Sequence, residues 1–183
     1  MSGLAAIQEI EFREGDVRKR LFPADIDPGQ VIEIVSELGK ADSGVELTDL
    51  EKTLDINSVE LACLVNATQL LSLTRIHDGR IWISKQGIEL NSCTDIEKKK
   101  QLLNEGLRLV EPFTTALKLA KNEKIFSSDE VADLLSQEDL MWAEDQEINE
   151  ILVHRMLIDW LLFTGLLKID EETNMFSMEV SFA

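Results

Sequence analysis

One stretch of sequence decides the fold of this chain, Leu73-Thr74-Arg75-Ile76-His77-Asp78-Gly79-Arg80-Ile81-Trp82-Ile83. Two short β-prone runs, 73–76 and 80–83, flank an Asp-Gly pair. Such a pair favours a tight turn, because glycine readily adopts a positive φ. The stretch therefore predicts a two-stranded β-hairpin.

The residues before this hairpin predict a helix, a short strand and two more helices. Pro28 suits the first turn of a helix that Gly39 ends, and Val45-Glu46-Leu47 is short enough for a small strand. Two capping boxes follow, Thr48-Asp49-Leu50-Glu51 and Asn57-Ser58-Val59-Glu60, and each predicts the start of a helix. Helix, strand, helix, helix and hairpin is the order of a winged-helix unit, a variant of the helix-turn-helix.

The second half of the chain repeats this plan. After a small helix capped by Ser84, the box Thr94-Asp95-Ile96-Glu97 predicts a helix to about residue 121, which Pro112 should kink or split in two. A strand at Ile125-Phe126, a capped helix from Ser127, a helix over 146–163 and a second hairpin around 170–174 complete the repeat. The last helix is expected to bury one face, made by Ile148, Leu152, Met156, Trp160 and Phe163.

We therefore expect a mostly α fold with small β-hairpins, an α+β class. Residues 1–27 would form an N-terminal connector segment, 28–93 a first winged-helix unit and 94–183 a second one, joined by the long helix that contains Pro112. The alternative is an irregular α+β domain whose two hairpins are unrelated.

Composition limits the possible partners. The chain has 35 Asp and Glu against 18 Lys and Arg, a net charge of −17, which repels nucleic acid and anionic lipid unless basic residues gather in one place. Its 44% of hydrophobic residues can build a core. With two cysteines, no secretory leader and no apolar run long enough for a bilayer, the sequence indicates a cytoplasmic acidic protein.

The charge pattern argues against DNA binding, a common activity of winged helices. The helix over 57–71 contains no Lys or Arg, and only Asn66 and Gln69 could read bases. The helix over 146–163 contains one basic residue, Arg155, and three acidic residues, Glu147, Glu150 and Asp159. The remaining route is a patch made by Arg75 and Arg80 of the hairpin together with Lys98-Lys99-Lys100.

No motif predicts an enzyme. The chain has no GxxxxGK or GxGxxG phosphate motif, and its Cys and His residues lack metal-ligand spacing. We therefore expect no catalytic residue, no cofactor and no metal, and interpret Cys63 as a small core residue and Cys93 as a partly exposed thiol. A weak divalent-cation site within 144–150 is the alternative to a solvated acidic face. A small enzyme would need a pocket lined by His77, Cys63 or His154.

The strongest charge segregation lies between Lys124 and Arg155, where the chain carries nine acidic residues and no Lys or Arg. We predict that a partner binds at the centre of this region. Trp142 would either pack back onto the second unit or anchor the partner, while Trp160 belongs to the core. The predicted partner-interface residues are Glu138, Asp139, Trp142, Glu144, Asp145 and Glu147.

Several short motifs are shared with a known family. They are Leu21-Phe22-Pro23, Asp27-Pro28-Gly29-Gln30-Val31-Ile32, the helices over 49–64, Ile83-Ser84-Lys85-Gln86-Gly87, Glu97-Lys98-Lys99, and above all Ile158-Asp159-Trp160 with residues 166–170. With them, residues 21–178 resemble the AAA-associated C-terminal domain, which follows the ATP-binding subunit of bacterial and archaeal ABC transporters of the nitrate, sulfonate and taurine type. Leu161-Leu162-Phe163 departs from the more polar residues usual after the Trp. The resemblance implies a regulatory or docking role beside a transport ATPase and transfers no catalytic residue.

Three hypotheses of function follow. The first is a non-enzymatic, cytoplasmic regulatory or protein-interaction module whose partner is a transport ATPase or a second copy of the chain. The alternative is a winged-helix transcriptional regulator that binds DNA and dimerises through the helix over 96–121. The third, a small enzyme, depends on the pocket described above.

Overall fold

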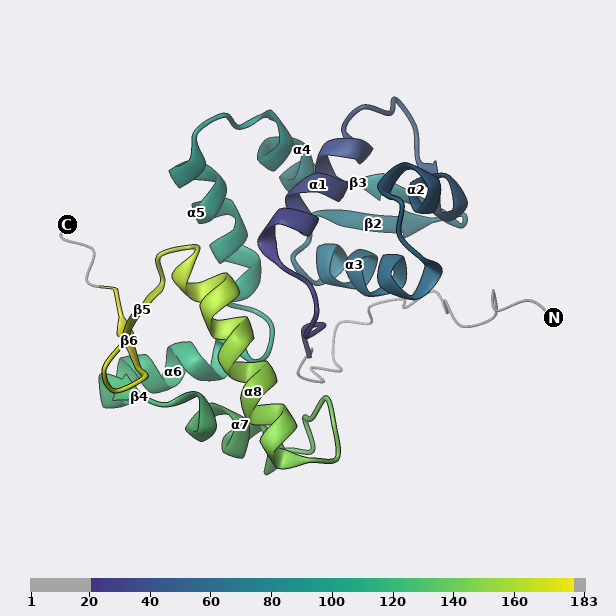
Figure 1. Ribbon diagram of the computed structural model, residues 1–183. Helices are drawn as coiled ribbons and strands as arrows, with labels where there is room; N and C mark the ends of the chain where they lie inside the picture. Colours follow the sequence, from purple (N-terminus) through teal and green to yellow (C-terminus); the bar gives the residue numbers. More distant parts are fainter. Residues whose placement is uncertain (1–20, 180–183) are drawn as a thin grey trace.

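The computed structural model describes residues 21–179 and is mostly helical, with two small antiparallel sheets (Figure 1). This confirms the predicted α+β class. Residues 1–20, which make up most of the predicted connector and include the Arg18-Lys19-Arg20 cluster, lie outside the described residues.

The first half has the predicted order of elements. The sheet order is β1-β3-β2, and Ile76 pairs with Ile81 across the predicted hairpin. Asp78 and Gly79 both have positive φ, 51° and 71°, as a tight turn requires. The elements are α1 Pro28–Leu38, β1 Val45–Glu46, α2 Leu47–Leu54, α3 Ser58–Leu70, β2 Thr74–His77 and β3 Arg80–Ile83.

The second half repeats the first, element by element. Two helices, α4 Lys85–Ser92 and α5 Ile96–Leu107, connect the halves. The second sheet has the order β4-β6-β5, which is the order of the first sheet, and this favours the tandem interpretation over unrelated hairpins. The elements are α6 Phe113–Glu123, β4 Ile125–Phe126, α7 Ser128–Ser136, α8 Gln146–Met156, its π-helical continuation η1 Leu157–Leu162, β5 Leu167–Asp170 and β6 Met175–Met178.

Most predicted helix starts are confirmed, and two are wrong. Asn57, Ser84 and Ser127 each cap a helix through a side-chain oxygen. Thr48 does not, because the strand pairing of β1 continues through Glu46 and α2 begins directly at Leu47. For α5 the capping residue is Asp95 rather than Thr94, since the Asp95 carboxylate accepts the Glu97 amide.

Pro112 splits the predicted long helix instead of kinking it. Helix α5 ends at Leu107, and α6 begins at Phe113, directly after the proline. Proline has no amide hydrogen and its ring obstructs the preceding turn, so a helix cannot run through it without a break. The carboxylate of buried Glu111 accepts the Thr115 amide at 2.9 Å and so supports the start of α6.

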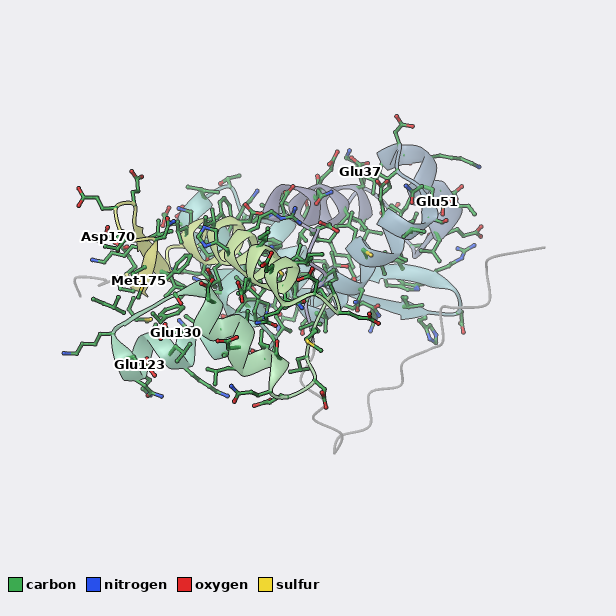
Figure 2. All side chains as sticks on the ribbon, turned by 60° about the horizontal axis from the view of Figure 1, so that its bottom comes forward. Glu37, Glu51, Glu123, Glu130, Asp170 and Met175 are labelled. Atoms are coloured by element: carbon green, nitrogen blue, oxygen red, sulfur yellow. The ribbon has the colours of Figure 1, made fainter. Side chains whose placement is uncertain are left out.

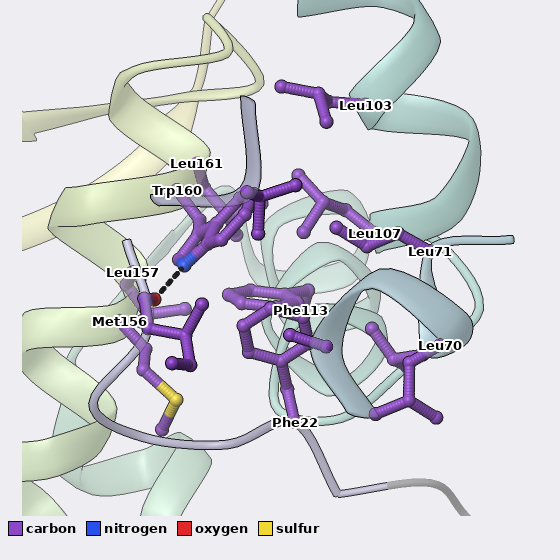
Figure 3. Packing of buried hydrophobic residues seen from close by; sticks show 14 of the residues in the cluster. Phe22, Leu70, Leu71, Leu103, Leu107, Phe113, Met156, Leu157, Trp160 and Leu161 are labelled. Atoms are coloured by element: carbon purple, nitrogen blue, oxygen red, sulfur yellow. Dashed lines mark hydrogen bonds between the residues drawn. The ribbon is translucent and has the colours of Figure 1, made fainter. Parts of the chain in front are cut away.

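One hydrophobic core runs through both halves. Figure 3 shows Leu70 and Leu71, at the end of α3, near Leu107, Phe113 and Trp160 of the second half. At Gly106 an added Cβ would lie 2.9 Å from the Leu71 Cα, so α5 approaches the end of α3 at backbone distance. The two repeats therefore pack as one body.

Candidate functional site

The most distinctive surface lies around the turn between α7 and α8. This turn occupies residues 137–145, whereas the equivalent turn between α2 and α3 occupies only residues 55–57. The acidic side chains of the predicted interface are all exposed here, and we call them together with exposed Ile148 and Ile151 the α8 surface. The acidic members are Glu138, Asp139, Glu144, Asp145 and Glu147.

Acidic charge as such does not distinguish this surface. Figure 2, which labels Glu51 in the first half and Glu130 in the second, shows carboxylates projecting from both halves. What distinguishes the α8 surface is that the segment of sequence that forms it, between Lys124 and Arg155, contains no Lys or Arg.

Asn149 fixes the shape of the turn. Its side chain is buried, and its Oδ1 accepts the amides of Trp142 and Ala143 at 2.8 and 3.1 Å. Its Nδ2 donates to the carbonyls of Ala143 and Asp145 at 2.7 and 2.9 Å. Asn149 was not among the predicted site residues. The available signal was an asparagine inside a predicted helix, where this residue is disfavoured.

Trp142 packs inward, which was one of the two expected outcomes. Its indole nitrogen donates to the Phe22 carbonyl at 2.8 Å, and its partly buried ring packs against the core. The ring therefore fixes residues 21–27 against the second half. The exposed part of the predicted interface is the acidic side chains around it.

Ile148 was predicted to be buried, and the structure corrects this. It is 45% exposed, and Ile151 is 67% exposed. The buried face of α8 is instead set by Asn149, Val153 and Met156, so Ile148 lies about 100° away from it around the helix axis. Two large apolar side chains therefore stand beside the acidic ones.

The chain before α1 lies along α8. The Arg155 guanidinium donates to the Ala24 carbonyl at 2.8 Å and pairs with the Asp25 carboxylate. Trp160 donates to the Ile26 carbonyl at 2.8 Å, the bond drawn in Figure 3. Residues 21–27 thus pass from Trp142, before the start of α8, to η1 at its end, and part of the predicted connector is a packed strap.

Among the described residues, Asp159 has a shifted pKa, and it lies near Arg155 and near Asp27 at the end of the strap. Burial raises the pKa of the Asp159 carboxyl above its ordinary value of 3.8; Arg155 lowers it and the nearby Asp27 raises it further.

The basic residues that could have supported DNA binding do not form one patch. Arg80 pairs with Glu46 at 2.9 Å, Lys98 with Glu89 at 3.5 Å and Lys100 with Glu97 at 2.8 Å. Figure 1 shows the β2–β3 turn and the start of α5 on opposite sides of the molecule. The hairpin and the lysine cluster therefore do not form one continuous basic surface that could bind a phosphate backbone.

The candidate catalytic residues are scattered. Cys63 is exposed, which corrects its interpretation as a core residue, because it lies on the outer face of α3; Cys93 is partly exposed, as predicted. One contact was not predicted from the sequence. The His154 Nδ1 lies 3.1 Å from the Ser128 Oγ, but Ser128 is buried at the start of α7. That contact ties α7 to α8 and leaves the hydroxyl inaccessible to a substrate.

Grooves and acidic clusters add no further site. An open groove lies against Ile125 and the β5–β6 hairpin, and its lining includes none of His77, Cys63 and His154. Within residues 21–179, including the acidic stretch 144–150, no group of three Cys, His or acidic residues is arranged to hold a metal ion. Across the same residues, every helix is too short or too polar to cross a membrane.

A comparison with protein families places most of these elements in one family. The model described as "C-terminal AAA-associated domain" matches residues 48–170, more than half of the chain, from α2 to the end of β5. The match confirms the resemblance that the short motifs indicated. No curated protein and no solved structure matches the chain.

Proposed function

The chain belongs to the C-terminal AAA-associated domain family, and on this premise we propose that it is a non-enzymatic module that docks on a transport ATPase of the ABC class and regulates it in the cytoplasm. The α8 surface is the docking site. Its partner presents basic side chains to the acidic residues and apolar ones to Ile148 and Ile151.

The observation that carries this proposal is the composition of the α8 surface. Two exposed isoleucines stand among exposed acidic side chains, in a stretch of chain without a single Lys or Arg. Exposed apolar groups bordered by charge are typical of protein-binding sites. The acidic border would speed association with a basic partner and select against acidic ones.

The repeated architecture supports the same proposal. We interpret each half as a winged helix, with α3 and α8 in the positions from which such units read a DNA groove. The exposed residues of α3 include Val59, Ala62, Cys63 and Asn66 and no basic side chain. Helix α8 faces solvent with isoleucines and acids. Both helices suit contact with protein better than contact with phosphate.

The test measures association with the ABC ATPase subunit of the nitrate, sulfonate and taurine class from the same organism. The full chain is compared with a D139N/E144Q/E147Q variant by surface plasmon resonance at low and high ionic strength. Asp145 is kept because its carboxylate caps α8. We expect the association rate to fall about tenfold in the variant and with added salt. The matched control is E171Q/E172Q, which neutralises equally exposed acids in the β5–β6 turn.

Regulation is tested in the same mixture by the rate of ATP hydrolysis. The full chain should change that rate and the acid-neutralised variant should not at the same concentration. An association rate insensitive to salt and to the three substitutions would contradict the proposal.

DNA binding is tested with the same preparation. A tight complex with bulk genomic DNA, weakening steeply as salt is added, would favour the transcriptional regulator instead.

A further inference from the structure

The outer edge of β5 carries backbone groups that have no partner in the described part of the chain. Opposite residues of an antiparallel strand pair alternate between those that exchange hydrogen bonds and those that do not. The Glu179 amide donates to the Leu166 carbonyl, so Lys168 and Asp170 are the residues of β5 that bond to β6. The amide and the carbonyl of Ile169 therefore point away from β6. Such an edge is a template for pairing with another strand.

This part of β5 is accessible. Lys168 and Asp170 are exposed, and Ile169 is half-buried. These three residues line the open groove that also includes Ile125 and Met175. Figure 2 shows Asp170 and Met175 at the margin of the molecule. The edge is therefore open to a strand from outside.

The side chains on either side of Ile169 form a self-complementary pattern. When two copies of β5 pair antiparallel about a two-fold axis at Ile169, each Ile169 exchanges backbone hydrogen bonds with the other. Each Lys168 then lies opposite the Asp170 of the other copy, and opposite charges in this position stabilise a strand pair. Lys168 has no ion pair in the described structure. The Asp170 Oδ1 accepts the Glu172 and Thr173 amides, and its Oδ2 has no partner among the described residues.

The equivalent edge of the first half lacks this pattern. The Ser84 amide donates to the Leu73 carbonyl, so by the same alternation Ile76 is a residue of β2 whose amide and carbonyl point outward. Pairing of two copies about Ile76 would place Arg75 opposite His77, and neither side chain is an acid. Of these two equivalent edges, only that of β5 is complementary to itself.

We propose that two copies of this chain associate through β5. Their second sheets, each of three strands, then form one antiparallel sheet in the order β4-β6-β5-β5-β6-β4. The contact consists of the backbone hydrogen bonds at Ile169 and the two Lys168–Asp170 pairs. This proposal goes beyond the proposed function and does not rest on it.

The contact is small, so the dimer is weak. Two strands of four residues bury less than the ~1,200 Å² of a stable protein interface. The net charge of −17 on each copy also opposes association, but salt at physiological ionic strength screens this repulsion beyond about 8 Å. The Lys168–Asp170 pairs act at contact distance, where screening is weaker. We therefore expect dimers at high protein concentration and physiological salt.

Sedimentation equilibrium of the full chain tests this up to a concentration of about 1 mM. K168E places two acids opposite each other, and D170K places two lysines there, so each variant alone should raise the dimer dissociation constant about tenfold or more. In a mixed dimer of one K168E copy and one D170K copy, both pairs again have opposite charges. An equal mixture should therefore return the dissociation constant to within about threefold of the parent value.

Hydrogen exchange locates the contact without any substitution. The Ile169 amide should exchange several-fold more slowly in concentrated than in dilute protein, because pairing gives it an acceptor. The Ile76 amide, which also points outward, is the matched control and should not depend on concentration.

Proline substitution tests the same edge. Ile169→Pro removes the outward amide and spares the hydrogen bonds to β6, so it should abolish association. Ile76→Pro makes the same change at a half-buried isoleucine of β2 and should leave association unchanged. Circular dichroism verifies that each variant is folded.

A chain that stays monomeric up to about 1 mM would overturn the proposal. A dimer that K168E and Ile169→Pro leave intact would also overturn it, and so would exchange at Ile169 that does not depend on concentration. Because these measurements contain no ATPase, their failure leaves the proposed function standing. Failure of docking on the ATPase likewise leaves the β5 dimer standing.

Discussion

The two halves of this chain share one topology and differ in chemistry. Their sheets have the same strand order, and α3 and α8 occupy the same place in that order. In the first half a turn over 55–57 leads into a helix whose exposed side chains include Val59, Glu60 and Cys63. In the second half a turn over 137–145, held by Asn149, adds acids and exposes isoleucines. The comparison teaches that a few more residues in one turn can give the second copy of a repeated scaffold a surface of different chemistry.

The halves also differ in what fills their cores. The second contains Trp160 and Phe113, and Phe22 from the strap lies between them, with ring centroids 5.0 and 5.3 Å away. The strap precedes the first half in sequence but packs on the second. The order of segments along the chain is therefore not the order of packing.

The largest expected effect comes from Trp160→Ala. Trp160 is fully buried, and its loss removes ring contacts and the bond to Ile26, so the free energy of unfolding should fall by about 3–5 kcal/mol. Urea unfolding measures this, followed by circular dichroism and, in a Trp142→Phe background where Trp82 is the tryptophan left after Trp160→Ala, by fluorescence from the first half. Because one core joins the halves, both signals should shift together.

Ile125→Ala is the control. Because Ile125 is 59% exposed, this variant should lose little of the free energy of unfolding. If the two signals showed separate transitions, and the Trp82 transition were unaffected by Trp160→Ala, the two halves would not unfold as one cooperative unit.

The next comparison is between the equivalent helices α7 and α2. Ser127→Ala should cost about 1 kcal/mol, because the Ser127 hydroxyl accepts the Glu130 amide at the start of α7. Thr48→Ala should change the free energy of unfolding by less than about 0.5 kcal/mol, because Thr48 is exposed and caps nothing. The midpoints of urea unfolding measure both losses. Equal losses in the two variants would show that Ser127 does not cap its helix more strongly than Thr48.

Trp142→Phe tests the strap, with an expected loss of similar size. It removes the indole donor to the Phe22 carbonyl, worth about 1 kcal/mol, and should speed hydrogen exchange at the Phe22 amide, which bonds to Glu111. Trp82→Phe is the matched change in the first half. The Trp82 Nε1 is buried without a hydrogen-bond partner in the described structure, so losing its N–H should cost nothing by this mechanism. Unchanged exchange at Phe22 would argue against the strap.

The smallest expected effect is a pH dependence at Asp159. Its pKa is raised in the folded state, so as pH rises above 3.8 the unfolded chain releases this proton first and unfolding becomes relatively more favourable. Asp159→Asn should therefore match the parent chain at lower pH and become more stable than it as pH rises through the folded-state pKa. Thermal unfolding at a series of pH values from acid to neutral measures the difference in stability between the variant and the parent chain.

Glu172→Gln, at an exposed acid in the β5–β6 turn, is the control for the loss of one negative charge. A gap for Asp159→Asn that is widest at the acid end would reverse the sign of the pKa shift.

Local sequence determined the elements of this protein. The Asp78-Gly79 turn, the caps at Asn57 and Ser127 and the break at Pro112 each depend on hydrogen bonds or steric limits within a few residues. Repeated twice, these local preferences were enough to predict the order of elements, and the short motifs were enough to predict the family.

Only the tertiary structure decided which surfaces face solvent. The contacts from Trp142 to Phe22 and from Trp160 to Ile26 join residues 120 and 134 positions apart. Such contacts form because the whole core minimises its exposed apolar area, a quantity that no local window contains. For the same reason helical periodicity indicated that α8 has a buried face but missed its orientation by one residue, which left Ile148 exposed beside the acids.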